Sequence, residues 1–415
     1  MVKKIMIIDE YKCVNYAGGI EKVICNFANE FTKRGYEVSI VCLDTEKGKP
    51  LFYLNSYVDF INLAYKYSKY TGVEYYLAKI WKEIKKVIKG KNCISDRGIY
   101  EDPRKRYFYS QFIYRLKKLL SEIRPDCIIC VSADSTYIAQ QANKDYIPII
   151  MMCHMNTEII VKESLDYQRL AWRNASAVQT LFPSYARVMR NAGANNVVTI
   201  PNIVYCVDSD NIAKLHKDKN IYRIITVGRV ERTLKRTILL VEAFCKIAHK
   251  YENWILDIYG EIDNRNYIKE INYLIEKNNL QGRIKLYGKT NDVVSKLKEA
   301  DIFAFPSKSE GFPLAMTEAM AVGLPVVAYK SCSGVNEIVV NGKTGFLVED
   351  GIDDFADKLE YLMNHKDLRV EMGEKARKSI LKYAPDIVFD QWEDLLISIL
   401  SEEKSNNSIV YKESE

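Results

Sequence analysis

The stretch that decides the fold is DIFAF, residues 301–305, followed by PSKSEGFPLAMTEAMAVGLP, residues 306–325. The first five residues are an apolar run of strand length, and the next twenty read as a polar loop and an apolar helix. Gly323 is a typical helix end, and Pro325 opens a further apolar run. This order of elements predicts a parallel strand–helix–strand unit.

The same alternation extends over both halves of the chain, with helices expected over residues 20–33 and 236–250. Strands that alternate with helices build parallel sheets covered on both faces. The sequence therefore predicts the α/β class, with two Rossmann-like domains that face each other. The expected strands are 3–8, 37–43, 127–131, 147–153, 177–180 and 197–200 in the first half, and 221–227, 254–259, 283–287, 301–305, 325–328 and 345–348 in the second.

The 415 residues are 48% hydrophobic and 27% charged, which suits two folded domains and excludes a largely disordered chain. No run is long enough to span a membrane, and the apolar start is too short for a signal peptide, so we expect a cytosolic protein. The expected parts are a first domain (1–203), a second domain (204–385), a helix crossing back to the first domain (386–400) and a mobile polar tail (401–415).

The net charge of +6 is unevenly spread, because residues 61–124 alone hold 16 basic and 6 acidic residues, with nine tyrosines. We expect a helical insertion here. Three interpretations stay open: a solvated helical face over a Tyr-rich core, a surface that docks on an anionic membrane, or a nucleic-acid surface. No nucleic-acid motif appears elsewhere, so no nucleic-acid partner is expected.

Cys127 and Cys130 have the spacing of a metal or redox pair. They lie in an expected strand, where residues three apart point to opposite faces. The pattern therefore favours buried free thiols.

Candidate site residues collect after strand ends, where parallel sheets bind their ligands. Gly18 and Gly19 open the first helix, either as an ordinary loop or as a close approach to an anion. Arg229, Lys235 and Arg236 follow the strand 221–227 and suit a diphosphate, or else a solvated helix start.

The loop and helix of residues 306–325 carry the strongest signal. Pro313 suits the first helical position, which leaves the amides of Leu314 and Ala315 to face a phosphate. Glu310 lies just before the helix, and Glu318 lies about 1.3 turns into it. A carboxylate at 318 suits the two hydroxyls of a ribose.

His154 follows the strand 147–153, either as a satisfied structural residue or as a side chain that faces the ligand. The dinucleotide fingerprint of three spaced glycines is absent, which argues against an NAD enzyme. Asp208 and Asp210 have the spacing of a metal-binding pair but lie in the expected linker. We therefore expect no metal and no cofactor, with Arg229 and Lys235 in the place of a cation.

Together these residues resemble glycosyltransferase family four, the retaining sugar-nucleotide transferases of GT-B fold. The resemblance is most specific over residues 222–395, and segment 50–125 carries none of it. The motifs that carry it are Gly18-Gly19-Ile20-Glu21, Pro201-Asn202, Gly228-Arg229 with Lys235, the block 310–318, and EIVVNGKTGFLV at 337–348.

The family resemblance implies roles for these residues. In the donor site, Arg229 and Lys235 hold the diphosphate, Glu318 holds the ribose, and Glu310 meets the sugar near its reacting carbon. The amides of Leu314 and Ala315 contact phosphate or sugar.

Further roles follow from the same resemblance. The loops at Gly260 and at Lys289-Thr290 border the base, and Gly18 and Gly19 border the acceptor, with Gly19 also under the diphosphate. His154 matches the cleft histidine of the family. The family often has a glycine where this chain has Arg236, which is expected to add a phosphate contact.

The implied activity is retaining transfer of a hexose or N-acetylhexosamine from a UDP-sugar to a lipid-linked oligosaccharide. The EGFP form of the motif is most similar to the branch that builds capsules and exopolysaccharides, at the inner face of the cell membrane. Three alternatives stay open: a sugar-nucleotide epimerase of the same fold, a catalytically silent partner subunit, and an enzyme with a soluble acceptor.

Overall fold

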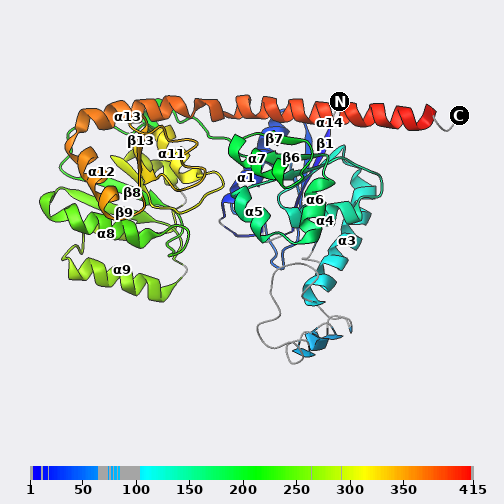
Figure 1. Cartoon of the computed structure of the whole chain (residues 1–415), viewed down its shortest axis with the longest axis horizontal. Coiled ribbons are helices and arrows are strands. Elements are labelled where there is room, and N and C mark those ends of the chain that lie inside the picture. The colour runs from blue at the N-terminus through cyan, green and yellow to red at the C-terminus, as the bar shows by residue number, and fades with distance from the viewer. Residues whose placement is uncertain are drawn as a thin grey trace. The chain divides into compact units, whose positions relative to one another are not determined.

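The computed structural model describes residues 3–10, 13–16, 18–63, 103–262, 264–290 and 292–412, with residues 73, 76, 77, 79–81, 83 and 84 (Figure 1). The chain divides into two compact units. Unit 1 holds residues 1–200 and 389–415, and unit 2 holds residues 201–388.

Unit 1 is built on a seven-stranded sheet with the order β3-β2-β1-β4-β5-β6-β7, in which every neighbouring pair is parallel. All six strands expected from the sequence are present, and β3 was not expected. The strands are β1 (Lys4–Asp9), β2 (Glu37–Cys42), β3 (Asp59–Asn62), β4 (Cys127–Cys130), β5 (Ile149–Met152), β6 (Ala177–Thr180) and β7 (Val197–Thr199). The helices are α1 (Gly19–Lys33), α3 (Pro103–Ile123), α4 (Ala133–Ala142), α5 (Thr157–Glu163), α6 (Asp166–Arg173) and α7 (Pro183–Asn191).

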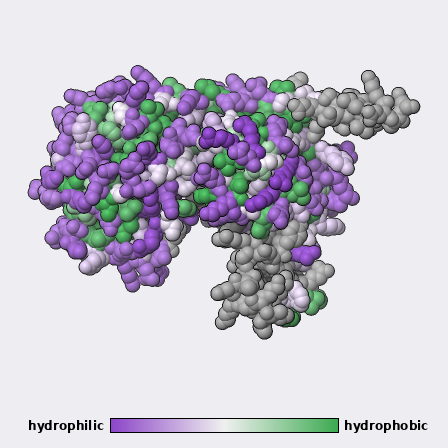
Figure 2. Space-filling view, in the orientation of Figure 1, coloured by the Kyte–Doolittle hydropathy of each residue, from purple (hydrophilic) through white to green (hydrophobic). Residues whose placement is uncertain are grey.

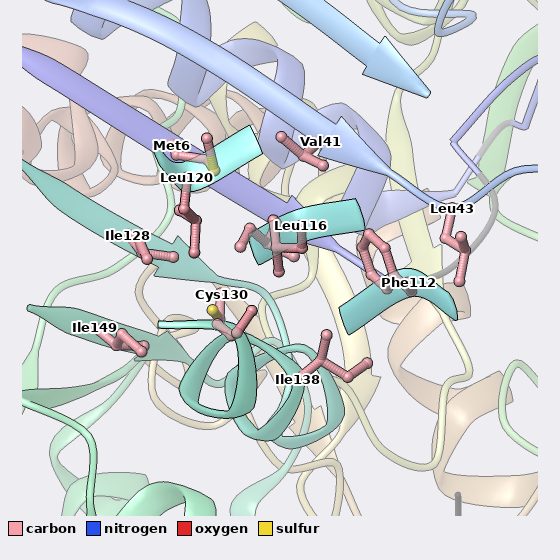
Figure 3. Close-up of a cluster of buried hydrophobic side chains, with 13 residues drawn as sticks. Met6, Val41, Leu43, Phe112, Leu116, Leu120, Ile128, Cys130, Ile138 and Ile149 are labelled. Atoms are coloured by element: carbon pink, nitrogen blue, oxygen red, sulfur yellow. The ribbon is translucent and has the colours of Figure 1, made fainter. Parts of the chain in front are cut away.

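The centre of unit 1 lies between β1, β4 and helices α3 and α4. Met6 and Ile8, at alternate positions of β1, belong to a cluster with Phe112 and Leu116 of α3, and all four side chains are buried. Figure 3 shows Met6, Phe112 and Leu116 within this cluster. Because β1 pairs on both sides, with Ile7 opposite Ile40 and Ile5 opposite Cys127, its backbone groups are satisfied inside the sheet.

The segment 61–124, expected as a helical insertion between strands, contributes to unit 1 at both of its ends. Its final helix, α3, packs on the sheet through Phe112, Leu116 and Leu120, and its first residues complete the edge strand β3. Helix α3 therefore covers the first sheet, and β3 is one of its strands. The remainder of the insertion lies largely outside the described residues. The two cysteines of β4 are buried free thiols, as the strand pattern predicts.

Unit 2 has a six-stranded sheet with the order β10-β9-β8-β11-β12-β13, again parallel throughout. All six strands were expected from the sequence. They are β8 (Tyr222–Val227), β9 (Trp254–Tyr259), β10 (Ile284–Gly288), β11 (Ile302–Phe305), β12 (Val326–Tyr329) and β13 (Gly345–Val348). The helices are η2 (Ser209–Asn211), α8 (Thr237–Ile247), η3 (Ala248–Lys250), α9 (Arg265–Lys277), α10 (Val293–Lys298), α11 (Leu314–Val322), α12 (Asp353–Asn364), α13 (Lys366–Ser379) and η4 (Leu381–Tyr383).

The last helix, α14 (Pro385–Lys412), belongs to unit 1 from Phe389 onward. Phe389 and Trp392 are buried against the rings of Phe27 and Phe31 on α1. Arg34 adds ion pairs to Asp390 at 2.8 Å and Glu393 at 2.5 Å. The helix runs to Lys412, so the tail expected over 401–415 is helical over most of its length, in keeping with its Glu and Lys content.

Among the described residues, no helix combines the length and apolar character needed to cross a bilayer. The face seen in Figure 2 is mainly polar, with smaller hydrophobic areas between polar residues.

The packing of α14 on α1 predicts a large stability effect. Phe389→Ala removes a buried ring and is expected to lower the free energy of unfolding of unit 1 by about 3–5 kcal/mol. The matched control is Ile397→Ala on the same helix, where the side chain is 63% exposed and the expected cost is below about 0.5 kcal/mol. Urea denaturation measures both, and equal costs would contradict this role of α14.

Candidate active site

Three glycines lie at the carboxyl ends of adjacent strands in unit 2. The amide of Gly228, after β8, donates to the carbonyl of Tyr259, and that of Gly260, after β9, donates to Gly288 at 2.8 Å. A Cβ on Gly260 would overlap the carbonyl oxygen of Gly228, and the φ of Gly260 is 152°. Only glycine permits this approach, so the strand ends present bare backbone to any ligand at this edge.

The loop between β8 and α8 is shaped by Glu231. Its carboxylate accepts hydrogen bonds from the Thr233 hydroxyl at 2.6 Å and from the amides of Leu234 and Lys235. Burial opposes ionisation of Glu231, but these donors outweigh it and lower the pKa. The result is a fixed turn that brings Lys235 back toward the strand ends. Glu231 was not among the residues expected from the sequence, where it is an acid six residues before the first residue of α8.

The structure brings together Lys235, one of the two residues expected at the diphosphate, and Glu310, the residue expected at the sugar. Lys235 Nζ lies 2.5 Å from Glu310 Oε1, and the side chains are 24% and 11% exposed. Glu310 is fixed by backbone contact with Ser333, whose carbonyl accepts from the Glu310 amide at 3.3 Å. A cation and a carboxylate therefore meet between the ends of β8 and β11.

Arg236 does not face the same position, in contrast to the sequence expectation. Its guanidinium donates to the carbonyls of Pro306 and Ser307 and pairs with Asp350 at 3.1 Å, while lying over the ring of Tyr329. Its backbone is left-handed, with φ 50°, at the N-cap of α8. Arg236 thus connects the loop after β11 to the start of α8. Its guanidinium group is already engaged in hydrogen bonds and an ion pair within the protein.

The start of α11 also departs from expectation. Pro313 occupies the N-cap instead of the first helical position, and the amide of Leu314 donates to the Phe312 carbonyl at 2.9 Å. The Leu314 amide is therefore already used. Ala315 stays in the first turn, where no carbonyl of the helix itself is available to its amide. Glu318 is half-buried one turn further along α11.

The remaining donor-side residues lie on loops of the same unit. Arg229 is exposed directly after Gly228. Lys289, after β10, forms an ion pair with Glu261 at 2.7 Å, which links the loops that follow β9 and β10. The Thr290 hydroxyl accepts from the Asp292 amide at 3.2 Å.

In unit 1, Gly18 is the N-cap of α1, and Gly19 is its first residue. A Cβ on Gly18 would overlap the carboxylate of Glu21, which is buried and whose pKa is raised by that burial. The glycine therefore makes room for the acid of the same motif. The preceding loop is held by Asp44, which accepts from the amides of Cys13 and Val14 at 3.0 and 2.9 Å.

His154 lies just after β5, at the carboxyl edge of the first sheet. Both ring nitrogens are shielded from solvent and have no hydrogen-bond partner among the described residues. Burial lowers the pKa of His154 to about 4, so the ring is neutral at physiological pH.

The Asp208 and Asp210 pair is exposed around η2, as expected for a solvated linker. Within the described part of the chain, no group of three or more His, Cys, Asp or Glu side chains is placed to hold a metal.

Two family profiles match the chain. The profile described as "Glycosyltransferase Family 4" matches residues 17–206, and the one described as "Glycosyl transferases group 1" matches residues 207–379. The chain belongs to glycosyltransferase family four. The first match spans the segment 50–125, where the sequence analysis found no family signal.

This glycosyltransferase is similar to several known proteins. It is 24% identical over 397 residues to an uncharacterized glycosyltransferase of Haemophilus influenzae, covering 92% of this chain and 97% of that protein. It is 33% identical to the capsular polysaccharide biosynthesis glycosyltransferase CapM of Staphylococcus aureus, over 46% of this chain and 50% of that one. It is 26% identical to the poly(ribitol-phosphate) alpha-N-acetylglucosaminyltransferase of the same species, over 69% and 58% of the two chains.

Solved structures have the same fold. A mutant of TarM from S. aureus, in complex with fondaparinux, alpha-GlcNAc-glycerol and UDP, superposes with a TM-score of 0.73 at 19% identity, covering 95% of this chain and 99% of that one. HepE of Anabaena, in complex with UDP and glucose, gives 0.68 at 17% identity, with coverage of 95% and 100%. Two Rossmann-like domains of GT-B type, as predicted, are confirmed.

The close approach of β8 and β9 yields a prediction. Gly260→Ala is expected to lower the melting temperature more than Gly288→Ala, because it adds a clash with Gly228 to the backbone strain. Gly288 has φ 76° with open space around it, so its substitution costs only the strain, about 1–2 kcal/mol. Thermal unfolding measures both variants, and equal melting temperatures would contradict the clash.

Proposed function

We propose that this glycosyltransferase moves a hexose or N-acetylhexosamine from a UDP-sugar to a lipid-linked oligosaccharide during capsule or exopolysaccharide synthesis. The observation that carries the proposal is the Lys235–Glu310 pair at the glycine-rich carboxyl edge of the second sheet. The ammonium group of Lys235 can bind a diphosphate, and the carboxylate of Glu310 can accept hydrogen bonds from sugar hydroxyls. The two groups are in direct hydrogen-bond contact. The UDP in the TarM and HepE structures and the capsular role named for CapM support this donor and pathway.

In the proposed reaction, Lys235 and the exposed Arg229 offset the charge that develops on the leaving diphosphate. Glu310 accepts hydrogen bonds from the donor sugar, and Glu318 accepts those of the ribose. The acceptor oxygen bonds to the anomeric carbon as the carbon–phosphate oxygen bond breaks. The acceptor's proton passes to the leaving phosphate oxygen on the same face, so the anomeric configuration is retained without a metal.

The roles of Lys235 and Glu310 are tested by substitution. Lys235→Ala and Glu310→Gln are each expected to reduce the kcat/KM of sugar transfer by about 100-fold or more, because each loses a charge-stabilising contact. The matched control is Lys250→Ala, which removes a lysine of the same unit paired to Glu360 at 3.0 Å, with an expected change below about twofold. Rates near wild type in both site variants would reject these roles.

The same assay separates the alternative functions. Nuclear magnetic resonance of the product identifies the anomeric configuration, and conversion of the UDP-sugar without an acceptor would identify an epimerase. Failure of UDP to bind in titration calorimetry would favour a silent partner subunit.

A lipid-linked acceptor requires contact with a membrane surface, and one described feature supports it. Residues 73, 76, 77, 80, 81 and 84 are helical at the spacing of a single helix face, and all are exposed, from 40% to 76%. The face holds Trp81 and Tyr76 among aliphatic side chains, and lysines at 79, 82, 85 and 86 surround it in the sequence. An apolar helix face can insert between lipid headgroups while neighbouring lysines pair with their negative charges, which suits an anionic bilayer.

This membrane contact is tested by co-sedimentation with vesicles. Wild-type protein is expected to bind vesicles of phosphatidylglycerol and phosphatidylcholine, and Trp81→Glu is expected to weaken binding by about tenfold or more. Tyr273→Glu is the control, because Tyr273 is 62% exposed in unit 2, outside this face. Wild type that stays in solution would favour a soluble acceptor, and equal binding by all three proteins would reject this face.

A further inference from the structure

Glu10 is a half-buried acid at the carboxyl edge of the first sheet that the proposed reaction does not use. It follows β1 directly, and its Oε1 accepts a hydrogen bond from the Ser132 hydroxyl at 2.7 Å. Ser132 follows the neighbouring strand β4 and caps helix α4 by accepting from the Ser135 amide at 3.0 Å. The position of Glu10 is therefore set by two adjacent strands and a helix start.

The other oxygen of this carboxyl group is unsatisfied. Glu10 Oε2 is shielded from solvent and has no hydrogen-bond partner among the described residues. His154 lies on the same edge after β5. Both of its ring nitrogens are likewise shielded from solvent and have no hydrogen-bond partner among the described residues. Since β5 is the neighbour of β4, two different polar groups with unused hydrogen-bonding capacity lie along one short part of this edge. Shielded polar groups without a partner are uncommon in folded proteins, and a bound ligand or water is one physical explanation for them.

The protonation of Glu10 fits a hydrogen-bonding role. Burial, with the negative charges of Asp9 and Asp134, raises the pKa of Glu10 to about 8, although the Ser132 hydroxyl acts in the opposite sense. The groups that face it are Asp9 on β1, Asp134 on α4 and the Cys130 thiol on β4. At neutral pH the carboxyl group is therefore neutral, able to donate through one oxygen and accept through the other.

We propose that Glu10, held by Ser132, binds a hydroxyl group of the sugar acceptor and positions it at the edge of the first sheet. The inference rests on the proposed glycosyl transfer and extends it to a residue outside the motifs of the family resemblance. A neutral carboxyl group suits this task, because it matches the donor and acceptor character of a sugar hydroxyl. No bond forms or breaks at Glu10, and its own proton stays in place.

The test uses the full chain, saturating UDP, and octyl glycosides of glucose, galactose and N-acetylglucosamine as acceptor probes. Glu10→Ala is expected to weaken glycoside binding about tenfold or more relative to wild type at pH 7, and to bind with an affinity that does not change with pH. Glu10→Gln, which keeps a donor and an acceptor, is expected to recover most of that loss. Wild-type affinity should fall about tenfold from pH 7 to pH 9 as the acid ionises, whereas the Glu10→Gln variant should not change with pH.

Asp126→Asn is the matched control. Asp126 lies at the opposite, amino ends of the same two strands, where it accepts from the amides of Lys3 and Lys4 at 2.7 and 2.9 Å. It is expected to leave glycoside affinity and its pH profile unchanged. Wild-type affinity in Glu10→Ala, the same pH profile in wild type and Glu10→Gln, or a wild type that binds UDP but no glycoside would overturn the inference. If wild-type protein does not bind UDP at all, the proposed function itself is rejected.

A second measurement needs no ligand. The unfolded chain ionises Glu10 above about pH 4.5, whereas the folded chain keeps the proton to about pH 8, so folding loses stability as pH rises between these values. Glu10→Gln removes this loss, and its melting temperature relative to wild type should rise from pH 5 to pH 8. A difference that stays constant over this range would refute the neutral acid on which the inference depends.

Discussion

Burial of both faces of each parallel sheet is the constraint on which the rest of the structure depends. In β4, β5, β11 and β12 every residue is buried, so these strands have no side that faces water. Polar side chains are excluded from most of their length and collect where the strands end. The chemistry of this glycosyltransferase is therefore confined to the loops that follow the strands.

Those loops are held by polar groups that stay within the protein. Glu231 accepts hydrogen bonds from backbone amides of the turn before α8, and Asp44 does the same for the loop before α1. Arg236 connects two loops by donating to backbone carbonyl oxygens. Each is a charged residue whose hydrogen bonds are internal, and each fixes a backbone that carries a candidate site residue. Lys235 and Glu310 owe their short contact to this framework, because neither belongs to a regular element.

Much of the fold was predictable because apolar runs of strand length are strong local signals. The edge strand β3 was missed, since its four residues begin with Asp59 and end with Asn62 and carry little apolar pattern. In the site, Lys235, Glu310 and Glu318 follow from their places after strands. The use of Arg236 as a brace, the clash that requires Gly260, and the shielded oxygen of Glu10 depend on neighbours far away in the sequence. No local pattern contains that information, so only the folded chain supplies it.

The return of α14 to the first sheet has a consequence for how the protein is made. Unit 1 contains the first residues of the chain and also residues 389–415, so its aromatic cluster of Phe27, Phe31, Phe389 and Trp392 joins the two ends of the sequence. During synthesis the first sheet emerges from the ribosome early, with this face of α1 uncovered. Unit 2 is contiguous and can finish folding before that face is sealed. Unit 1 is therefore begun before unit 2 and completed after it, and a chain truncated within α14 leaves an apolar surface open.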